Sequence, residues 1–241
     1  MTLTRLTLAL LLAVTAYAQS PSFEVVSVKP NISGSGRSTE STNPGSLRAE
    51  NINAGSLIQQ AFGVRAFQIS GGPGWLTSDN YDVNAKTGTS KDLNDKELQP
   101  YLQALLADRF GFRYHRETKE LPVYSLVVLR SGTKLTAHTG GGDNSTNISN
   151  NAGRSSIRSV NASMANLANL LGGRLDRLVI DNTRLTGDYD LELEWAPNPT
   201  AESTEPSLFT ALQEQLGLKL ESTKGPVEII VIDNLDKPTE N

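Results

Sequence analysis

Polar and apolar positions along the chain form a pattern that occurs twice. Ser46–Gly63 and Ser156–Gly173 each begin with a short alternation of polar and apolar residues, which is typical of a strand. Residues 51–53 and 161–163 follow, and the polar residues at the two ends of each triplet have side-chain oxygens that can accept backbone N–H groups as helix N-caps. A glycine closes each stretch and favours a left-handed helix C-cap. Both stretches therefore predict a strand followed by a helix.

A second phrase also recurs, at Trp75–Lys86 and at Arg184–Trp195. Each copy contains Leu-Thr-small-Asp, then Tyr-Asp, then an alternation that predicts a turn leading into a strand. A further helix, a glycine and another strand are expected in both halves, over Leu102–Val128 and Leu208–Ile232. Within the latter range, Thr223–Val227 predicts a hairpin turn into a last apolar strand.

The shared order of these matches predicts an internal duplication. The expected fold class is α+β, with two tandem β-α-β-β-α-β-β repeats, each a small mixed sheet packed against two helices. Two unrelated α+β domains are the alternative. We expect a signal peptide at 1–18, an N-terminal strand, a polar loop and the first repeat at 19–130, a Gly/Asn/Ser-rich linker at 131–155, and the second repeat with the C-terminal tail at 156–241.

The N-terminal segment predicts export. Arg5 precedes an apolar run from Leu6 to Val14, and the segment closes on the small-x-small pattern of Ala16–Ala18. The run is shorter than the ~20 residues that span a bilayer, and the small residues are typical of signal-peptidase cleavage. We therefore expect a periplasmic or extracellular protein with no integral membrane segment after cleavage. A buried N-terminal helix is the alternative.

Composition narrows the function classes. The formal net charge is −4 and the chain has no basic cluster, which argues against nucleic-acid binding because phosphate neutralisation dominates that affinity. The absence of cysteine excludes disulfides, thiolate catalysis and Cys-ligated zinc. Aromatic residues make up 6% of the chain and leave few stacking platforms for bases or sugars. No cofactor is expected.

An acidic stripe on the predicted strand at 188–195 is the best site candidate in the sequence. Because side chains alternate along a strand, four carboxylates share one face: Asp188, Asp190, Glu192 and Glu194. Carboxylates two residues apart lie ~6.5–7 Å from one another, too far for several to chelate one ion without a neighbouring segment. The same face of the first repeat carries Asp82, Asn84 and Lys86, so the stripe is not shared. A solvated sheet face is expected, and a surface for a cation or a basic partner is the alternative.

Neither histidine has a catalytic context. His115 lies on the polar face of an alternating stretch and His138 lies in the predicted linker, so both are expected to be exposed. The chain has no G-x-S-x-G nucleophile motif and no His-x-x-x-His pair for zinc. Ser70–Trp75 (Ser-Gly-Gly-Pro-Gly-Trp) lacks the order of a phosphate-binding loop and predicts a turn between strands, with a functional loop as the alternative.

Five stretches carry a resemblance to a known family: Phe23–Pro30, Gly71–Lys86, Leu105–Val128, Arg184–Trp195 and Ala211–Asn241. They look like the soil-associated family of exported proteins known as domain of unknown function 3738. The resemblance implies export and brings no established activity, cofactor or catalytic residue. Some relatives attach a similar domain to a membrane metallopeptidase of the beta-lactam-sensor type, which implies a sensory or partner-binding role. This chain lacks the His-Glu-x-x-His motif of that peptidase, so its activity is not implied.

The order of elements also resembles, by topology alone, the short N-terminal domain of secretins and TonB-dependent receptors, a periplasmic docking module. We therefore expect an exported, non-catalytic envelope protein that binds a protein partner or a ligand. A secreted hydrolase that acts on an extracellular polymer through acids such as Asp188 and Asp190 is the alternative. A purely structural secreted protein is the third hypothesis.

Overall fold

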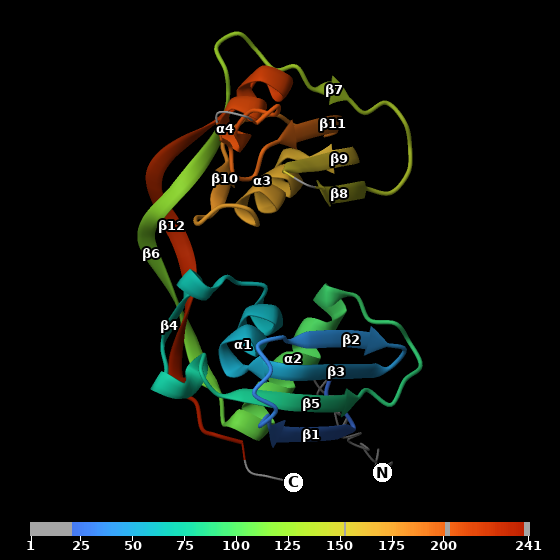
Figure 1. The fold of residues 1–241 in the computed structure, drawn as a ribbon, viewed down its shortest axis with the longest axis vertical. Helices are drawn as coiled ribbons and strands as arrows, with labels where there is room; N and C mark the ends of the chain where they lie inside the picture. Colours follow the sequence, from blue (N-terminus) through green and yellow to red (C-terminus); the bar gives the residue numbers. More distant parts are fainter. Residues whose placement is uncertain (1–20, 152, 201–202, 239–241) are drawn as a thin grey trace, which may run out of the picture. The chain divides into compact units, whose positions relative to one another are not determined.

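The computed structural model describes the chain in three stretches, residues 21–151, 153–200 and 203–238 (Figure 1). The signal peptide predicted at 1–18 lies outside these residues. The predicted α+β class is confirmed, because the described stretches contain four α-helices and three four-stranded sheets.

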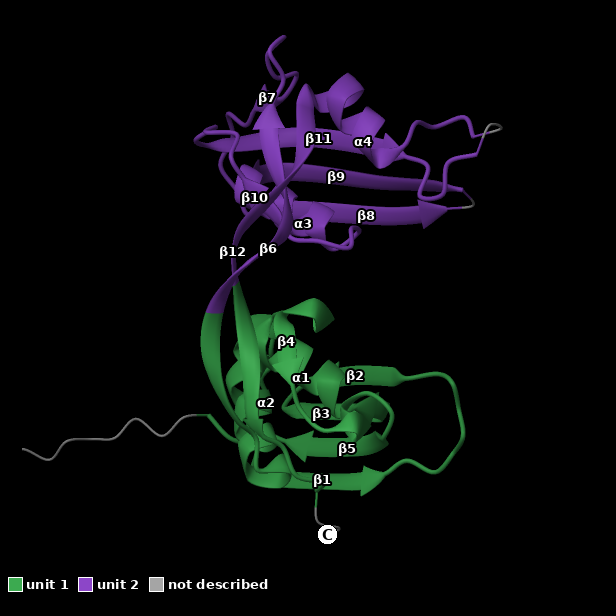
Figure 2. Ribbon diagram, turned by 90° about the vertical axis from the view of Figure 1, so that its left-hand side faces the viewer, with its two compact units in different colours: residues 1–117, 228–241 green, residues 118–227 purple. Residues whose placement is uncertain are grey.

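Two compact units divide the chain (Figure 2). Unit 1 consists of residues 1–117 and 228–241, and unit 2 consists of residues 118–227. Two long strands, β6 (Arg113–Val128) and β12 (Leu218–Asn234), each pass from one unit into the other. Residues 228–238 therefore belong to unit 1, whereas the repeated pattern predicts them in the second repeat.

Unit 1 is built on an antiparallel sheet with the strand order β1-β5-β3-β2. Its elements in chain order are β1 (Val25–Pro30), β2 (Thr39–Asn43), β3 (Ser46–Asn53), α1 (Ala54–Phe62), β5 (Asn80–Lys86) and α2 (Asp95–Phe110). The short strand β4 (Ile69–Gly71) lies between the 3-10 turns η1 (Ala66–Gln68) and η2 (Gly74–Leu76) and pairs in parallel with β12. The glycine-rich stretch that precedes β5 is thus part of a turn.

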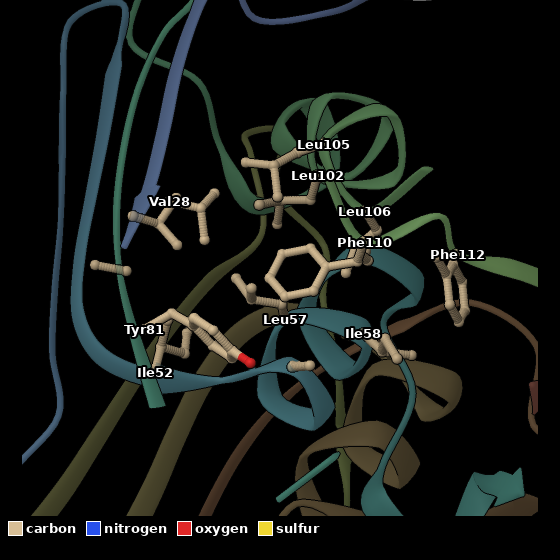
Figure 3. Packing of buried hydrophobic residues seen from close by; sticks show 14 of the residues in the cluster. Val28, Ile52, Leu57, Ile58, Tyr81, Leu102, Leu105, Leu106, Phe110 and Phe112 are labelled. Atoms are coloured by element: carbon tan, nitrogen blue, oxygen red, sulfur yellow. The ribbon is translucent and has the colours of Figure 1, made fainter. Parts of the chain in front are cut away.

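The core of unit 1 joins the two helices to the sheet (Figure 3). Leu57 of α1 and Leu102 and Leu106 of α2 are almost completely buried, as is Phe110 at the end of α2. The ring of Tyr81, from β5, meets the ring of Phe110 edge to face, with 5.4 Å between centroids. Full burial of one such side chain contributes about 1.5–3 kcal/mol, which explains the apolar positions at helical spacing.

Side-chain caps begin the helices where the sequence predicts them. Asn53 Oδ1 accepts the backbone N–H of Ser56 at 2.8 Å, and Ser163 Oγ accepts that of Asn166 at 3.2 Å. At the first helix end, Gly63 has φ 62°, a conformation that L-residues with a side chain rarely adopt. Gly173 differs, because it keeps a right-handed helical φ of −62°.

Unit 2 contains a second antiparallel sheet, with the strand order β7-β11-β9-β8. Its elements are β7 (Thr136–Ala137), β8 (Ser145–Asn151), β9 (Arg154–Ser163), α3 (Met164–Gly172), β10 (Val179–Asp181), β11 (Asp188–Trp195) and α4 (Leu208–Ala211), which a π-helical turn, η3 (Leu212–Leu216), extends. Its core gathers buried residues from α3, β9, β11, α4 and η3. β10 pairs in parallel with β6.

Three segments differ from the sequence-based expectation. The predicted linker at 131–155 contains β7 and β8, and the polar loop before β3 contains β2. These strands carry almost only exposed side chains, so backbone pairing holds them and no apolar alternation marks them. The turn predicted at Thr223–Val227 is wrong: β12 continues through it, because Gly225 has no positive φ and the strand stays extended.

Candidate functional site

The repeated Tyr-Asp phrase places an aspartate beside a bulge. In unit 2 the register between β9 and β11 shifts next to Asp190, and Asn161 at this bulge has φ 57°. The backbone N–H of Asn161 donates to Asp190 Oδ1 at 3.0 Å, and His138 Nδ1 lies 2.8 Å from the same oxygen. These contacts lower the pKa of Asp190, with the Asn161 N–H as the larger cause and His138 as the next.

Unit 1 repeats this arrangement with different loop residues. The register between β3 and β5 shifts beside Asn51, which has φ 58°. Its backbone N–H donates to Asp82 Oδ1 at 3.0 Å, and Asn31 Nδ2 donates to the same oxygen at 2.7 Å. Asp82 and Asp190 therefore serve the same structural purpose: each satisfies the backbone of a bulge and anchors a neighbouring loop.

His138 is not the exposed linker residue that the sequence predicts. Its side chain is 13% exposed because the segment around β7 packs on β11, and its backbone N–H donates to Asp188 O at 2.9 Å. Its Nε2 atom is buried and has no hydrogen-bond partner in the part of the chain that the structure describes.

The other carboxylates of the predicted stripe lie at the surface and are held by arginines. Glu192 pairs with Arg158 across the β9–β11 ladder, and Glu194 pairs with Arg154. Asp188 is exposed at the start of β11. No group of three or more His, Cys, Asp or Glu in the described stretches is arranged to hold a metal ion. The stripe is thus a sheet face with cross-strand ion pairs.

His115 lies in unit 1 with 49% of its side chain exposed, as predicted for the polar face of its strand. Glu117 Oε1 lies 3.2 Å from its Nε2, and Asp233 Oδ1 lies 2.8 Å from its Nδ1. Both carboxylates raise the pKa of His115, Glu117 more than Asp233. Two neighbouring carboxylates occupy both ring nitrogens, an arrangement that stabilises the charged ring.

A groove in unit 2 combines apolar walls with one charged group. It has a volume of about 420 Å³, in the range of small-molecule sites. Four segments line it: the ends of β8 and β9, the turn after α3, the end of β11 with the following prolines, and the start of α4. The lining residues are Asn150, Ser155, Arg174, Leu175, Trp195, Ala196, Pro197, Pro199, Ser207, Leu208 and Phe209.

Local contacts fix the walls of this groove. The chain after β11 folds back so that the Ala196 N–H donates to Pro206 O at 2.8 Å, and Ser207 then caps α4 through the Thr210 N–H. Gln215 of η3 exchanges two hydrogen bonds with the backbone of Glu194, at 2.9 and 2.8 Å. Trp195, the next residue, is 4% exposed and forms a rigid apolar wall.

Arg174 is the one charged residue among the described residues of the groove. Its Nη1 donates to Leu170 O at 2.9 Å, and its guanidinium carbon lies 5.9 Å from the centroid of the Trp195 ring. No described carboxylate lies within ion-pair distance of it, and burial alone lowers the pKa of Arg174. A half-buried guanidinium that has no ion-pair partner among the described residues favours the binding of an anion.

A larger cavity, in unit 1, lacks this feature. It has a volume of about 510 Å³ and is lined by residues that include Tyr81, Asp79 and Lys237. Lys237 Nζ pairs with Asp79 Oδ2 at 2.7 Å, so the cation of this cavity already has a carboxylate partner. The groove of unit 2 is therefore the better candidate for a ligand site.

No sequence pattern points to Arg174 or to the groove. The alternation along β11 predicts Trp195 on the apolar face of its strand, and the structure has it buried there. Arg174 follows a helix-ending glycine pair and carries no motif, and only the fold brings it to Trp195. The one available signal was Trp195 followed by Pro197 and Pro199, because an aromatic residue beside prolines forms a stiff apolar surface.

Comparisons with known proteins give a family and no activity. No helix in the described stretches has the length and apolar character needed to cross a membrane. No curated protein and no solved structure matches the chain. Residues 55–235, which are most of the chain and include the elements from α1 to β12, match the family described as "Protein of unknown function (DUF3738)". The chain therefore belongs to the DUF3738 family.

Proposed function

We propose that this protein is an exported, non-catalytic binding module of the cell envelope and that unit 2 holds its ligand in the Trp195 groove. Export rests on the N-terminal sequence, with its short apolar run and small-residue cleavage pattern. The observation that supports binding is the half-buried guanidinium of Arg174, which lies in an apolar groove without a carboxylate partner among the described residues.

The acidic stripe supports a binding module more than an enzyme. Glu192 and Glu194 are engaged by arginines, and Asp190 accepts hydrogen bonds from Asn161 and His138. In most glycoside hydrolases the general acid works with a second carboxyl group ~5–9.5 Å away across the scissile bond. The acids of the stripe instead follow one exposed strand face.

One observation favours the hydrolase alternative. Asp190 orients the His138 ring through Nδ1, and the buried Nε2 on the other side has no partner among the described residues. A histidine oriented by a carboxylate can act as a general base. Loss of hydrolysis of an envelope polymer in His138→Gln, with unchanged unfolding, would support this second candidate over the first.

Ligand-dependent stabilisation tests the binding module. A ligand that binds only the folded protein raises the unfolding free energy, by about 2.7 kcal/mol at 100 times its Kd. We expect members of a metabolite library to raise the melting temperature of the full chain, and Phe209→Ala in the groove to reduce this rise.

Phe67→Ala is the matched control, because Phe67 lies in unit 1 and is exposed to a similar extent: 41%, against 37% for Phe209. This variant should keep the full ligand response. A library without any stabilising member, or stabilisation that Phe209→Ala leaves intact, would contradict the proposed site.

A further inference from the structure

We propose that the groove takes a small organic monocarboxylate with an aromatic or branched aliphatic body, whose carboxylate lies on Arg174 and whose body packs against Trp195. This inference rests on the proposed function and adds the chemical class of the ligand. Three observations carry it: the hydrogen-bonding state of Arg174, the charge of the groove lining, and the character of its walls.

The guanidinium of Arg174 keeps most of its donors for a ligand. A guanidinium has five N–H groups in a planar fork, and the structure gives Arg174 one hydrogen-bond acceptor among the described residues, Leu170 O. This bond and the Trp195 ring hold the plane of the fork in place. The remaining donors match the two oxygens of a carboxylate, which arginine binds in a bidentate manner.

The charge of the groove favours a ligand with a single negative charge. Arg174 is the one cation among its described lining residues, and the other polar residues of this lining are neutral: Asn150, Ser155 and Ser207. All three are already engaged, since Ser155 Oγ donates to Asn150 Oδ1 at 2.9 Å and Ser207 Oγ accepts the Thr210 N–H at 3.2 Å. A phosphate dianion would leave one charge uncompensated in a partly desolvated site, at a substantial energetic cost.

The walls of the groove favour a ligand with an apolar body. Trp195, Leu208 and Phe209 supply aromatic and aliphatic surface, and Pro197 and Pro199 also line the groove. Rigid apolar surface of this kind gains affinity from burial and orders few side chains upon binding. A volume of about 420 Å³ suits one small molecule in contact with all of these residues.

Tryptophan fluorescence can report binding at this site alone. The chain has two tryptophans, Trp75 in unit 1 and Trp195 in the groove. Trp75→Phe therefore leaves Trp195 as the single reporter. In this background we propose titrations with phenylacetate and with phenylacetamide, which have the same ring and differ in charge.

We expect phenylacetate to bind at least about tenfold more tightly than phenylacetamide. Arg174→Gln should abolish this difference, and Arg174→Lys should keep part of it because lysine supplies charge without the planar fork. Arg177→Gln is the control: Arg177 stacks over Tyr124 and does not line the groove. The unfolding midpoint of each variant separates lost binding from lost folding.

The outcomes distinguish the two proposals. Equal binding of the acid and the amide overturns the carboxylate inference and leaves the proposed groove standing. Tighter binding of inorganic phosphate, or of a peptide that ends in phenylalanine, overturns the assigned ligand class. If no probe changes the Trp195 signal at millimolar concentration, the carboxylate inference fails, and a library without any groove ligand removes the proposed function as well.

Discussion

The backbone N–H of Asn161 donates to the side chain of Asp190 across a bulge in β9, with 3.0 Å between nitrogen and oxygen. Asn51 and Asp82 form the same pair in unit 1, also at 3.0 Å. The Tyr-Asp phrase that occurs twice in the sequence thus supplies the acceptor for a backbone group that a bulge removes from the strand ladder. We interpret the shared residues as scaffold and place the ligand site elsewhere.

Removal of the Asp190 carboxylate should destabilise the protein. Asp190→Ala leaves the Asn161 N–H and the His138 ring without their acceptor, and we expect a measurable loss in unfolding free energy because two polar groups lose their partner. Urea unfolding measures this loss. Glu192→Ala is the control, because its exposed ion pair with Arg158 should contribute less to the unfolding free energy. Equal effects of the two substitutions would contradict the scaffold interpretation.

The left-handed backbone conformation of Asn161 leads to a second prediction, about the stability of two variants at this position. Asn161→Ala and Asn161→Gly both remove the hydrogen bond from Asn161 Nδ2 to Gly142 O, so the difference between them isolates the effect of φ 57°. Alanine in this conformation is less favourable than glycine by about 1–2 kcal/mol. We expect thermal unfolding to show Asn161→Gly as the more stable variant, and the reverse order would exclude a strained bulge.

The raised pKa of His115 predicts that the stability of the protein depends on pH. Glu117 and Asp233 raise its folded-state pKa above the ordinary value of 6.5. Its contribution is therefore fully present below the unfolded pKa and is lost as the pH rises through the folded pKa. His115→Gln should flatten the stability curve in that window, measured as the urea midpoint against pH. A urea midpoint of the wild type that rises with pH in this window, relative to that of His115→Gln, would contradict the prediction.

Alanine substitutions at two glycines can distinguish the energetic cost of backbone strain from that of steric overlap. Gly45 and Gly34 have similar positive φ values, 70° and 65°. A Cβ atom at Gly45 would lie 1.6 Å from Thr89 O, whereas one at Gly34 meets no atom within 4 Å. We expect Gly34→Ala to lose about 1 kcal/mol and Gly45→Ala to lose clearly more, as measured by chemical denaturation. Similar losses of unfolding free energy in the two variants would mean that the turn after β2 has a different conformation from the one described.

The sequence predicts a structural feature correctly where that feature depends on a single residue type, as helix N-caps do. Asn53 and Ser163 cap helices as predicted, because their short polar side chains accept a free backbone N–H. The α+β class also followed from the change between helical and alternating spacing. The two antiparallel sheets have corresponding strand orders, which agrees with a duplication. The duplication itself stays a prediction.

The missed features depend on contacts between distant segments. β2 and β8 are edge strands with exposed side chains, so their composition resembles that of loops. His138 becomes buried only because its segment pairs with β11, 52 residues further along the chain. Arg174 lacks any local motif, and its significance comes from Trp195 and from the absence of a described carboxylate partner.

A crystal structure of the full chain grown with phenylacetate would show whether Arg174 and Trp195 hold a monocarboxylate. We expect density for the ligand in the unit 2 groove, with the carboxylate at hydrogen-bond distance from Arg174 and the ring against Trp195. An empty groove at saturating phenylacetate, or a ligand bound instead at the Asp190 bulge, would contradict this expectation.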